Sequence, residues 1–259
     1  MKSRIILCIG LTAIFLIPFF SVTMGQNQFE ILVYAQYDQY HKENIPVGIL
    51  AFKEMAQKHH FGLTWTMDAG IFTEKSMKDY AAIVFFNSKA DQFTDEQKQG
   101  LKNYINNGGG FVGIHAASTT DGQWSWYNQL IGRVFTDHPQ MQSGILEVVD
   151  PEFPATLHLP KKWIWTDEWY NFSEPKSDNL KVILKVDEST YNTTLGNGEP
   201  ISGMGDFHPI AWYQEFDGGR SFYSALGHNP GTYKDERHLE LIYGGIYWTA
   251  TGKGNMKNP

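Results

Sequence analysis

Histidines at loop-like positions are the first residues in this 259-residue chain that could do chemistry. Several stand beside or near proline, which stops a helix from continuing and can aim a side chain rigidly. Imidazoles together with a carboxylate can hold zinc or another divalent ion, or move a proton. No two histidines have the i, i+4 spacing of a helical ligand pair, so only the fold could bring them together. The loop histidines are His41, His138, His208 and His228.

His115 differs from these because it closes an apolar run, residues 111–114, that is typical of a buried strand. In an open parallel sheet, ligands bind outside the carboxyl ends of the strands, where this position predicts the imidazole to lie. The segment that follows carries hydroxyl groups and the carboxylate of Asp121. We expect His115 to act as a base or a metal ligand. The alternative is a hydrogen-bonded, partly buried histidine without a chemical role.

The densest group of aromatic and acidic side chains lies between residues 161 and 170. A strand would place alternate residues on opposite faces, so the two adjacent carboxylates would point apart and could not share a proton. Indole rings beside a carboxylate suit a sugar, whose C–H face packs on rings while its hydroxyls need acceptors. A tryptophan-rich core or a protein interface is the alternative. One face would carry Trp163, Trp165, Asp167 and Trp169, and the other Thr166, Glu168 and Tyr170.

The elements that must position these residues alternate between strand and helix in the first half of the chain. Apolar runs predict strands, and 3.6-residue periodicity predicts the helices between them. Thr94, with Gln97 three residues later, is typical of a helix start. This alternation favours a parallel sheet wrapped by helices. The predicted strands are residues 29–35, 61–67, 80–86 and 111–117, and the predicted helices are residues 47–60 and 94–107.

The second half reads as strands joined by loops, with a hairpin at Asp217-Gly-Gly219 and a closing helix over residues 234–249. Nothing resembles a linker or an internal repeat, so one α/β domain over residues 26–259 is expected. Its fold would be a mostly parallel central sheet with an antiparallel extension. The strands expected here are residues 144–149, 163–172, 182–186, 210–216 and 221–226.

Residues 1–25 have the pattern of a secretory signal, with Lys2 and Arg4 before an apolar run and small residues up to Gly25. We expect cleavage after Gly25 and an exported, periplasmic or secreted protein with no stable membrane insertion; an uncleaved anchor is the alternative. The only cysteine, Cys8, falls in this segment, so the remaining chain can form neither a disulfide nor a zinc–thiolate site. The net charge of −7 argues against nucleic acid as a partner.

Common nucleotide and hydrolase motifs are absent from the sequence, and no nucleotide cofactor is expected. Gly108-Gly-Gly110 is weak evidence for a phosphate loop because it precedes the strand. It is more typical of a helix end and turn.

Six short motifs, in the same order, resemble the ThuA-like (trehalose-utilisation) family over residues 29–252. They are Gly108-Gly-Gly-Phe-Val-Gly-Ile-His-Ala-Ala117, Phe135-Thr-Asp-His-Pro139, Asp167-Glu-Trp-Tyr170, His208-Pro-Ile-Ala-Trp212, Gly218-Gly-Arg-Ser-Phe-Tyr-Ser-Ala-Leu-Gly-His228 and Gly245-Ile-Tyr-Trp248.

This resemblance implies a flavodoxin-like three-layer sandwich of the class I glutamine amidotransferase superfamily. The superfamily's nucleophilic cysteine sits on the turn after a central strand, and His115 stands at that turn here. Amidotransferase chemistry is therefore not expected. The family implies sugar metabolism, on oxidised (3-keto) glucosides or disaccharides, by base- or metal-assisted lyase or hydrolase chemistry.

Three functions remain open from the sequence: a sugar-active enzyme, a sugar-binding module without catalysis, and an interaction protein that uses Trp163, Trp165 and Trp169 as an interface. Self-association is left open as well. For the enzyme, the catalytic candidates are His115, Glu168 and His208. The substrate-binding candidates are Trp165, Asp167, Trp169, Tyr170 and Asp121. A zinc-like divalent ion would take His41, His138 and His228 as ligands.

Overall fold

The computed structural model describes residues 26–194 and 198–254. The expected signal sequence, residues 1–25, lies outside the described residues. Within them, no helix is both long enough and apolar enough to cross a bilayer. The domain expected from residue 26 onward is built around a nine-stranded sheet, with a second sheet of two short strands.

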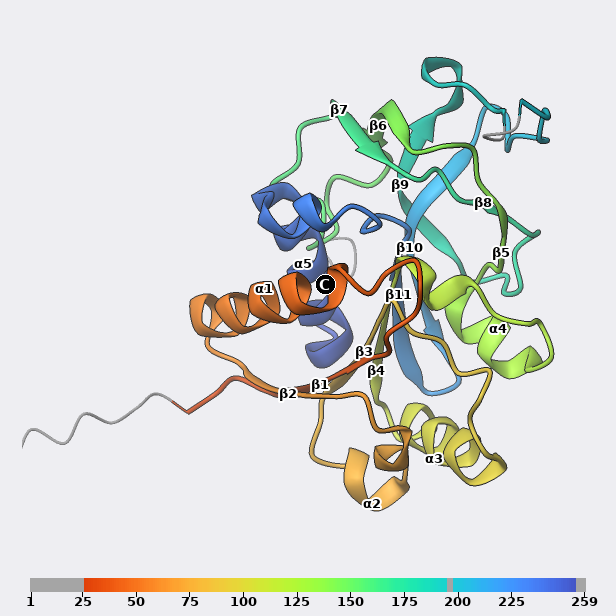
Figure 1. The fold of residues 1–259 in the computed structure, drawn as a ribbon. Coiled ribbons are helices and arrows are strands. Elements are labelled where there is room, and N and C mark those ends of the chain that lie inside the picture. Colours follow the sequence, from red (N-terminus) through yellow and green to blue (C-terminus); the bar gives the residue numbers. More distant parts are fainter. Residues whose placement is uncertain (1–25, 195–197, 255–259) are drawn as a thin grey trace, which may run out of the picture.

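Five parallel strands form one half of the large sheet (Figure 1). Their order, β2-β1-β3-β4-β11, is the flavodoxin-like arrangement, and the predicted parallel half is confirmed. Four of the five are buried along almost their whole length, as expected for strands covered on both faces. The strands are β1 (Glu30–Ala35), β2 (Gly62–Thr66), β3 (Ala82–Phe86), β4 (Gly110–Ile114) and β11 (Gly219–Ser224).

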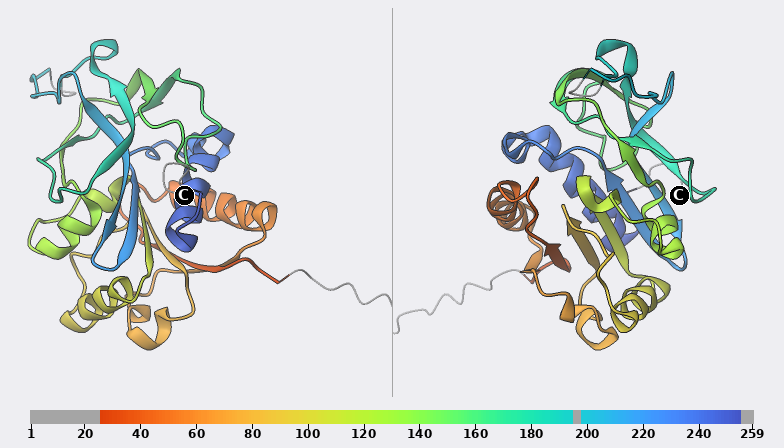
Figure 2. Two further views of the ribbon diagram at one scale, coloured as in Figure 1. Left: turned by 180° about the vertical axis from the view of Figure 1, so that it is seen from behind. Right: turned by 45° about the vertical axis from the view of Figure 1, so that its right-hand side comes forward.

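Helices cover both faces of this parallel half, which gives three layers (Figure 2). One face is covered by α1 (Asn44–His59) and α5 (Glu236–Thr251), which also contact each other. The other face is covered by α3 (Asp95–Asn106) and α4 (Ser125–Ile131), with the short α2 (Glu74–Met77) against α3. Sequence patterns had not indicated α4.

The antiparallel extension continues the sheet in the order β10-β9-β6-β7. Its hairpin between β10 and β11 turns at Asp217 and Gly218, both with positive φ, as the Asp-Gly-Gly sequence predicted. The small second sheet pairs β5 with β8. The strands are β5 (Phe135–Asp137), β6 (Gln142–Val148), β7 (Lys162–Asp167), β8 (Asn171–Phe172), β9 (Lys181–Asp187) and β10 (His208–Phe216).

Two predicted strands are shorter in the structure. The strand expected over residues 111–117 ends at Ile114, because His115–Ser118 forms the 3₁₀ turn η2. The strand expected over residues 163–172 breaks after Asp167, because the segment then leaves β6 to pair with β5. The break lets Glu168 and Tyr170 turn toward the end of the parallel strands.

Local sequence signals account for the ends of α3. Thr94 and Gln97 form the expected capping box, and the helix ends before Gly108, which has a φ of +93°. The three-glycine segment is therefore a helix end and turn, as the sequence favoured, and it enters β4 at its amino end. It lies at the opposite end of the strand from His115.

The tryptophan-rich segment belongs to the core. Trp163 and Trp165 are almost fully buried and Trp169 is completely buried, so these rings form no exposed interface in this chain. The expected alternation along β7 is confirmed through Asp167.

A buried histidine in α5 makes stability depend on pH. His238 packs against the rings of Tyr233 and Trp165, and among the described residues neither of its ring nitrogens has a hydrogen-bond partner. Burial lowers its pKa to about 4. An unfolded histidine titrates near pH 6.5, so the unfolded chain takes up this proton first as the pH falls. Stability from this group is full above about pH 6.5 and is lost down to about pH 4.

We expect His238→Leu to remove that part of the acid sensitivity, which for one such imidazole amounts to about 3 kcal/mol. Urea unfolding of both proteins at pH 7.5, 6 and 5 measures it. His158→Gln, at an exposed position, is the matched control and should behave like the wild type. Equal losses of unfolding free energy in the wild type and His238→Leu would show that His238 is not the group responsible.

Candidate metal centre and active site

The loops that follow four parallel strands meet at one edge of the sheet. His41 follows β1, Asn87 follows β3, His115 follows β4 and His228 follows β11. The chain crosses over between β1 and β3, and open α/β sheets bind ligands at such a switch point, outside the carboxyl ends of the strands. The predicted location of His115 is confirmed.

Three of these imidazoles form a cluster. His41, His115 and His228 each offer a ring nitrogen, and the three nitrogens lie within 4.8 Å of one another. The ring centroids are 5.0 Å apart for His41 and His115 and 5.3 Å apart for each of them with His228. His41 and His115 are buried, whereas His228 is partly exposed. Such a set matches the three-histidine sites that bind catalytic zinc with one position left open.

Two of the three histidines are oriented as metal ligands usually are. The Nδ1 atom of His41 lies 2.8 Å from the carboxylate of Asp38, and Nδ1 of His115 lies 2.7 Å from the carbonyl oxygen of Ala225. Ligating histidines commonly donate their second N–H to a carboxylate or carbonyl in this way. Nε2 of His41 is buried and has no hydrogen-bond partner among the described residues. The donor set therefore fits a divalent ion.

The backbone at His115 is in an uncommon conformation. Its φ is +49°, and Asn87 at the end of the neighbouring strand has a φ of +48°. Side chains other than glycine adopt this region at a cost, and such residues gather at functional sites. The turn aims the His115 ring back under the strand ends.

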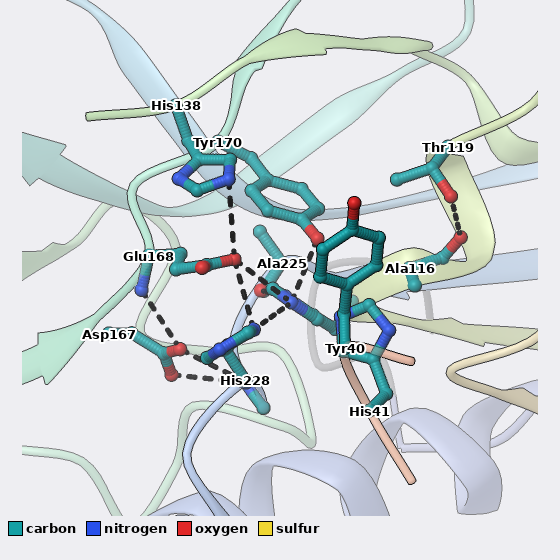
Figure 3. A network of polar contacts seen from close by, with 12 residues as sticks. Tyr40, His41, Ala116, Thr119, His138, Asp167, Glu168, Tyr170, Ala225 and His228 are labelled. Atoms are coloured by element: carbon teal, nitrogen blue, oxygen red, sulfur yellow. Dashed lines mark hydrogen bonds and ion pairs between the residues drawn. The ribbon is translucent and has the colours of Figure 1, made fainter. Parts of the chain in front are cut away.

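Glu168 lies between histidines from different parts of the chain (Figure 3). One of its carboxylate oxygens is 3.0 Å from Nδ1 of His228, 3.6 Å from Nε2 of His115 and 3.7 Å from Nε2 of His138. Burial alone would raise the pKa of Glu168, but hydrogen bonds and charges of His115 and His228 outweigh it and lower the pKa. The same carboxylate raises the pKa of His228 against its burial. Glu168 is thus an anion at neutral pH.

Tyr170 reaches the cluster from the same segment. Its hydroxyl lies 2.8 Å from Nε2 of His115, and its ring lines a cavity beside the cluster. Burial raises the pKa of Tyr170 well above its ordinary value, so the phenol remains protonated.

Asp167 connects this segment to the loop that carries His228. Its side chain is fully buried and accepts backbone N–H groups of Gly227 and His228, each at 3.0 Å, and of Glu168 at 3.1 Å. The indole N–H of Trp165 donates a fourth hydrogen bond. Burial raises the pKa of Asp167, although these donors oppose the shift.

The cavity beside the cluster has a volume of about 690 Å³. It has the size of a pocket for a small molecule. Two exposed aromatic rings, Tyr37 and Tyr40, stand in its lining, and most of its other polar groups are uncharged. The lining also includes Gln36, Gln39, Asn87, Ser88, Gln92, Thr119, His138, Glu168, Tyr170 and His228.

Five predicted site residues lie away from this cavity. Asp167 is occupied by its four donors, and Trp165 packs under Arg237 and His238. Trp169 is fully buried beside Tyr191. In the described structure these three cannot contact a ligand in the cavity, so their expected role as sugar contacts does not hold there. Asp121 is exposed and accepts the backbone N–H of Gln123, outside the cavity lining.

The fifth residue is His208, which was expected to be catalytic. It is fully buried, with Nδ1 near the Tyr191 hydroxyl and the Glu188 carboxylate, and Nε2 2.8 Å from the carbonyl oxygen of Tyr170. It supports the backbone of Tyr170 and does not line the cavity. His138 does line the cavity, but it faces Glu168 and is not part of the three-histidine group.

Sequence reasoning missed the residues that hold the cluster from outside. Asp38 orients His41, and the side-chain amide of Asn44 donates to the carbonyls of Gly227 and His228. A carboxylate three residues before a loop histidine was a usable signal for Asp38. Asn44 had none, because its partners lie more than 180 residues away.

Residues 30–249 match the family described as "ThuA: Trehalose utilisation". The chain belongs to the ThuA family. No curated protein matches it in sequence. The resemblance carried by the six short motifs is thereby confirmed.

Solved structures show the same fold. A ThuA-like protein from Bacteroides uniformis is 24% identical, with a TM-score of 0.75, and the match covers 86% of this chain and 92% of that one. A ThuA-like protein from Parabacteroides merdae is 20% identical, with a TM-score of 0.70 and coverage of 89% and 93%. A GMP synthase subunit from Thermoplasma acidophilum is 10% identical, with a TM-score of 0.54 and coverage of 88% and 97%. The predicted flavodoxin-like, class I glutamine amidotransferase-like fold of this ThuA protein is confirmed.

Asp167→Asn tests whether the buried carboxylate holds the site together. An amide nitrogen would face at least one backbone N–H that now donates to oxygen. We therefore expect unfolding free energy to fall by about 1–3 kcal/mol. Chemical denaturation followed by tryptophan fluorescence measures it, with Asp178→Asn at an exposed position as the matched control. A loss no larger than that of the control would mean that Asp167 does not carry this load.

Proposed function

We propose that this ThuA-family protein is an exported, divalent-metal-dependent enzyme that acts on an oxidised (3-keto) glucoside or disaccharide by lyase or hydrolase chemistry. The observation that supports it most directly is the group of three imidazoles with Glu168 beside them, at the edge of a cavity. The family's description, trehalose utilisation, supports a sugar as the substrate.

The cavity lining supports a hydroxyl-rich, uncharged ligand. Amide and hydroxyl side chains of Gln36, Gln39, Asn87 and Thr119 can donate to or accept from sugar hydroxyls. Tyr40 is 70% exposed and directly precedes His41, so its ring offers a face for the C–H groups of a pyranose. Asp38 fixes this arrangement because it accepts the backbone N–H groups of both Tyr40 and His41.

The residues divide into ligands and a base. His41, His115 and His228 would hold the ion, which when bound acts as a Lewis acid toward a carbonyl oxygen. His115 is fully buried and does not line the cavity, which favours the ligand role over the base role for it. Glu168 is ionised and lines the cavity, so it can serve as the general base.

A 3-keto group acidifies the hydrogen on C2. Glu168 takes this proton, the electron pair forms the C1=C2 double bond, and the C1–O bond breaks to release the aglycone, which then gains a proton. Addition of water across the double bond completes a net hydrolysis. This chemistry needs one base and one electrophile at the carbonyl, whereas ordinary glycosidases need a pair of carboxylates.

Two substitutions separate the ligand and base roles. We expect His115→Ala to lose stoichiometric zinc and all turnover of a 3-keto-glucoside. Glu168→Gln should keep the zinc while turnover falls by about 10²–10⁴-fold, the usual contribution of a general base. Elemental analysis of the purified proteins and product release by chromatography measure both effects.

His158→Ala, an exposed histidine outside the cluster, is the matched control and should keep metal and activity. Wild-type protein that purifies and reconstitutes without any divalent ion would contradict the metal site. Zinc-loaded protein that binds the keto-sugar but forms no product would identify a binding module in place of an enzyme.

A further inference from the structure

The hydroxyl of Tyr170 contacts the same atom of His115 that the proposed metal site would use. It lies 2.8 Å from Nε2, closer than the 3.3 Å to Nδ1 of His228 and the 3.6 Å to the carboxylate of Glu168. Two groups cannot share one lone pair of an imidazole nitrogen. The contact therefore bears directly on how the site is loaded.

The other nitrogen of His115 decides which group donates. Nδ1 faces the carbonyl oxygen of Ala225 at 2.7 Å, and a carbonyl can only accept, so Nδ1 carries the proton. In the neutral ring, Nε2 is then an acceptor. The Tyr170 hydroxyl is consequently the donor, and it covers the lone pair that a metal ion would need.

Tyr170 cannot swing away from this place. Its ring centroid lies 4.2 Å from that of His115 and 4.3 Å from that of Phe135, and its backbone carbonyl accepts a hydrogen bond from His208. The residue is only 3% exposed. If Nε2 of His115 is taken by an ion, the hydroxyl stays within the site without its acceptor.

We infer that the Tyr170 hydroxyl occupies the ligand atom of His115 in the metal-free protein and, once a metal ion takes that atom, donates its hydrogen bond to the carbonyl oxygen of the bound substrate. This assignment rests on the proposed function. An unpaired hydroxyl in a buried site costs free energy, and a substrate carbonyl at the cluster satisfies it. A fixed donor at a carbonyl that gains negative charge also favours the transition state.

Tyr170→Phe tests this because it keeps the clamped ring and removes only the hydroxyl. Zinc affinity is measured by competition with a chelator, and kcat and KM are measured on a 3-keto-glucoside. We expect zinc to bind about 2- to 10-fold more tightly, because the competing hydrogen bond is gone. We also expect kcat to fall by about 10²-fold, with little change in KM.

Tyr104→Phe is the matched control, since it removes a buried hydroxyl that donates to backbone carbonyls away from the cavity. It should change neither zinc affinity nor kcat. Weaker zinc binding in Tyr170→Phe, or an unchanged kcat, would overturn the inference while leaving the metal enzyme intact. Wild-type protein that binds no zinc would refute the proposed function itself, and the role of Tyr170 with it.

A second measurement uses wild-type protein alone and does not depend on how the variant folds. In metal-free protein, ¹⁵N spectra of the histidine rings should show His115 protonated at Nδ1 and unprotonated at Nε2. The resonances are assigned by their loss in His115→Ala. The opposite tautomer would mean that Tyr170 is not the donor, and would overturn the inference.

Discussion

The buried carboxylate of Asp167 joins the two halves of this molecule. It stands at the end of β7, in the antiparallel half, and accepts backbone N–H groups from the loop after β11, in the parallel half. The candidate site lies on this seam. The three clustered histidines come from the parallel half, whereas Glu168, Tyr170 and His138 come from the antiparallel half. Without that junction, base and ligands would belong to separate surfaces.

Electrostatics make the cluster costly without a bound ion. His115 and His41 are buried with their rings in contact, and burial, together with the charge of His115, lowers the pKa of His41. Neutral imidazoles that are turned by outer hydrogen bonds toward a common point are suited to share one cation. Glu168 then balances part of that cation's charge, and the rest of the cavity is left polar and uncharged.

The general fold and His115 could be predicted from the sequence because both depend on local patterns. Apolar runs alternating with helical segments indicate a parallel sheet, and the end of such a strand is where ligands bind. His208 could not be separated from the true cluster in this way. It is followed by proline like His138, but Glu188, Tyr191 and the Tyr170 carbonyl satisfy its ring. Those partners meet only through strand pairing between distant segments. The same holds for the break after Asp167, which depends on β8 pairing with β5.

The most direct test of the account is the position of the metal in crystals of the zinc-loaded protein, located by anomalous scattering at the zinc edge. The account predicts one strong peak about 2.0–2.1 Å from a ring nitrogen of each of His41, His115 and His228. A zinc peak elsewhere in the molecule, or no peak beside these three rings at saturating zinc, would contradict it.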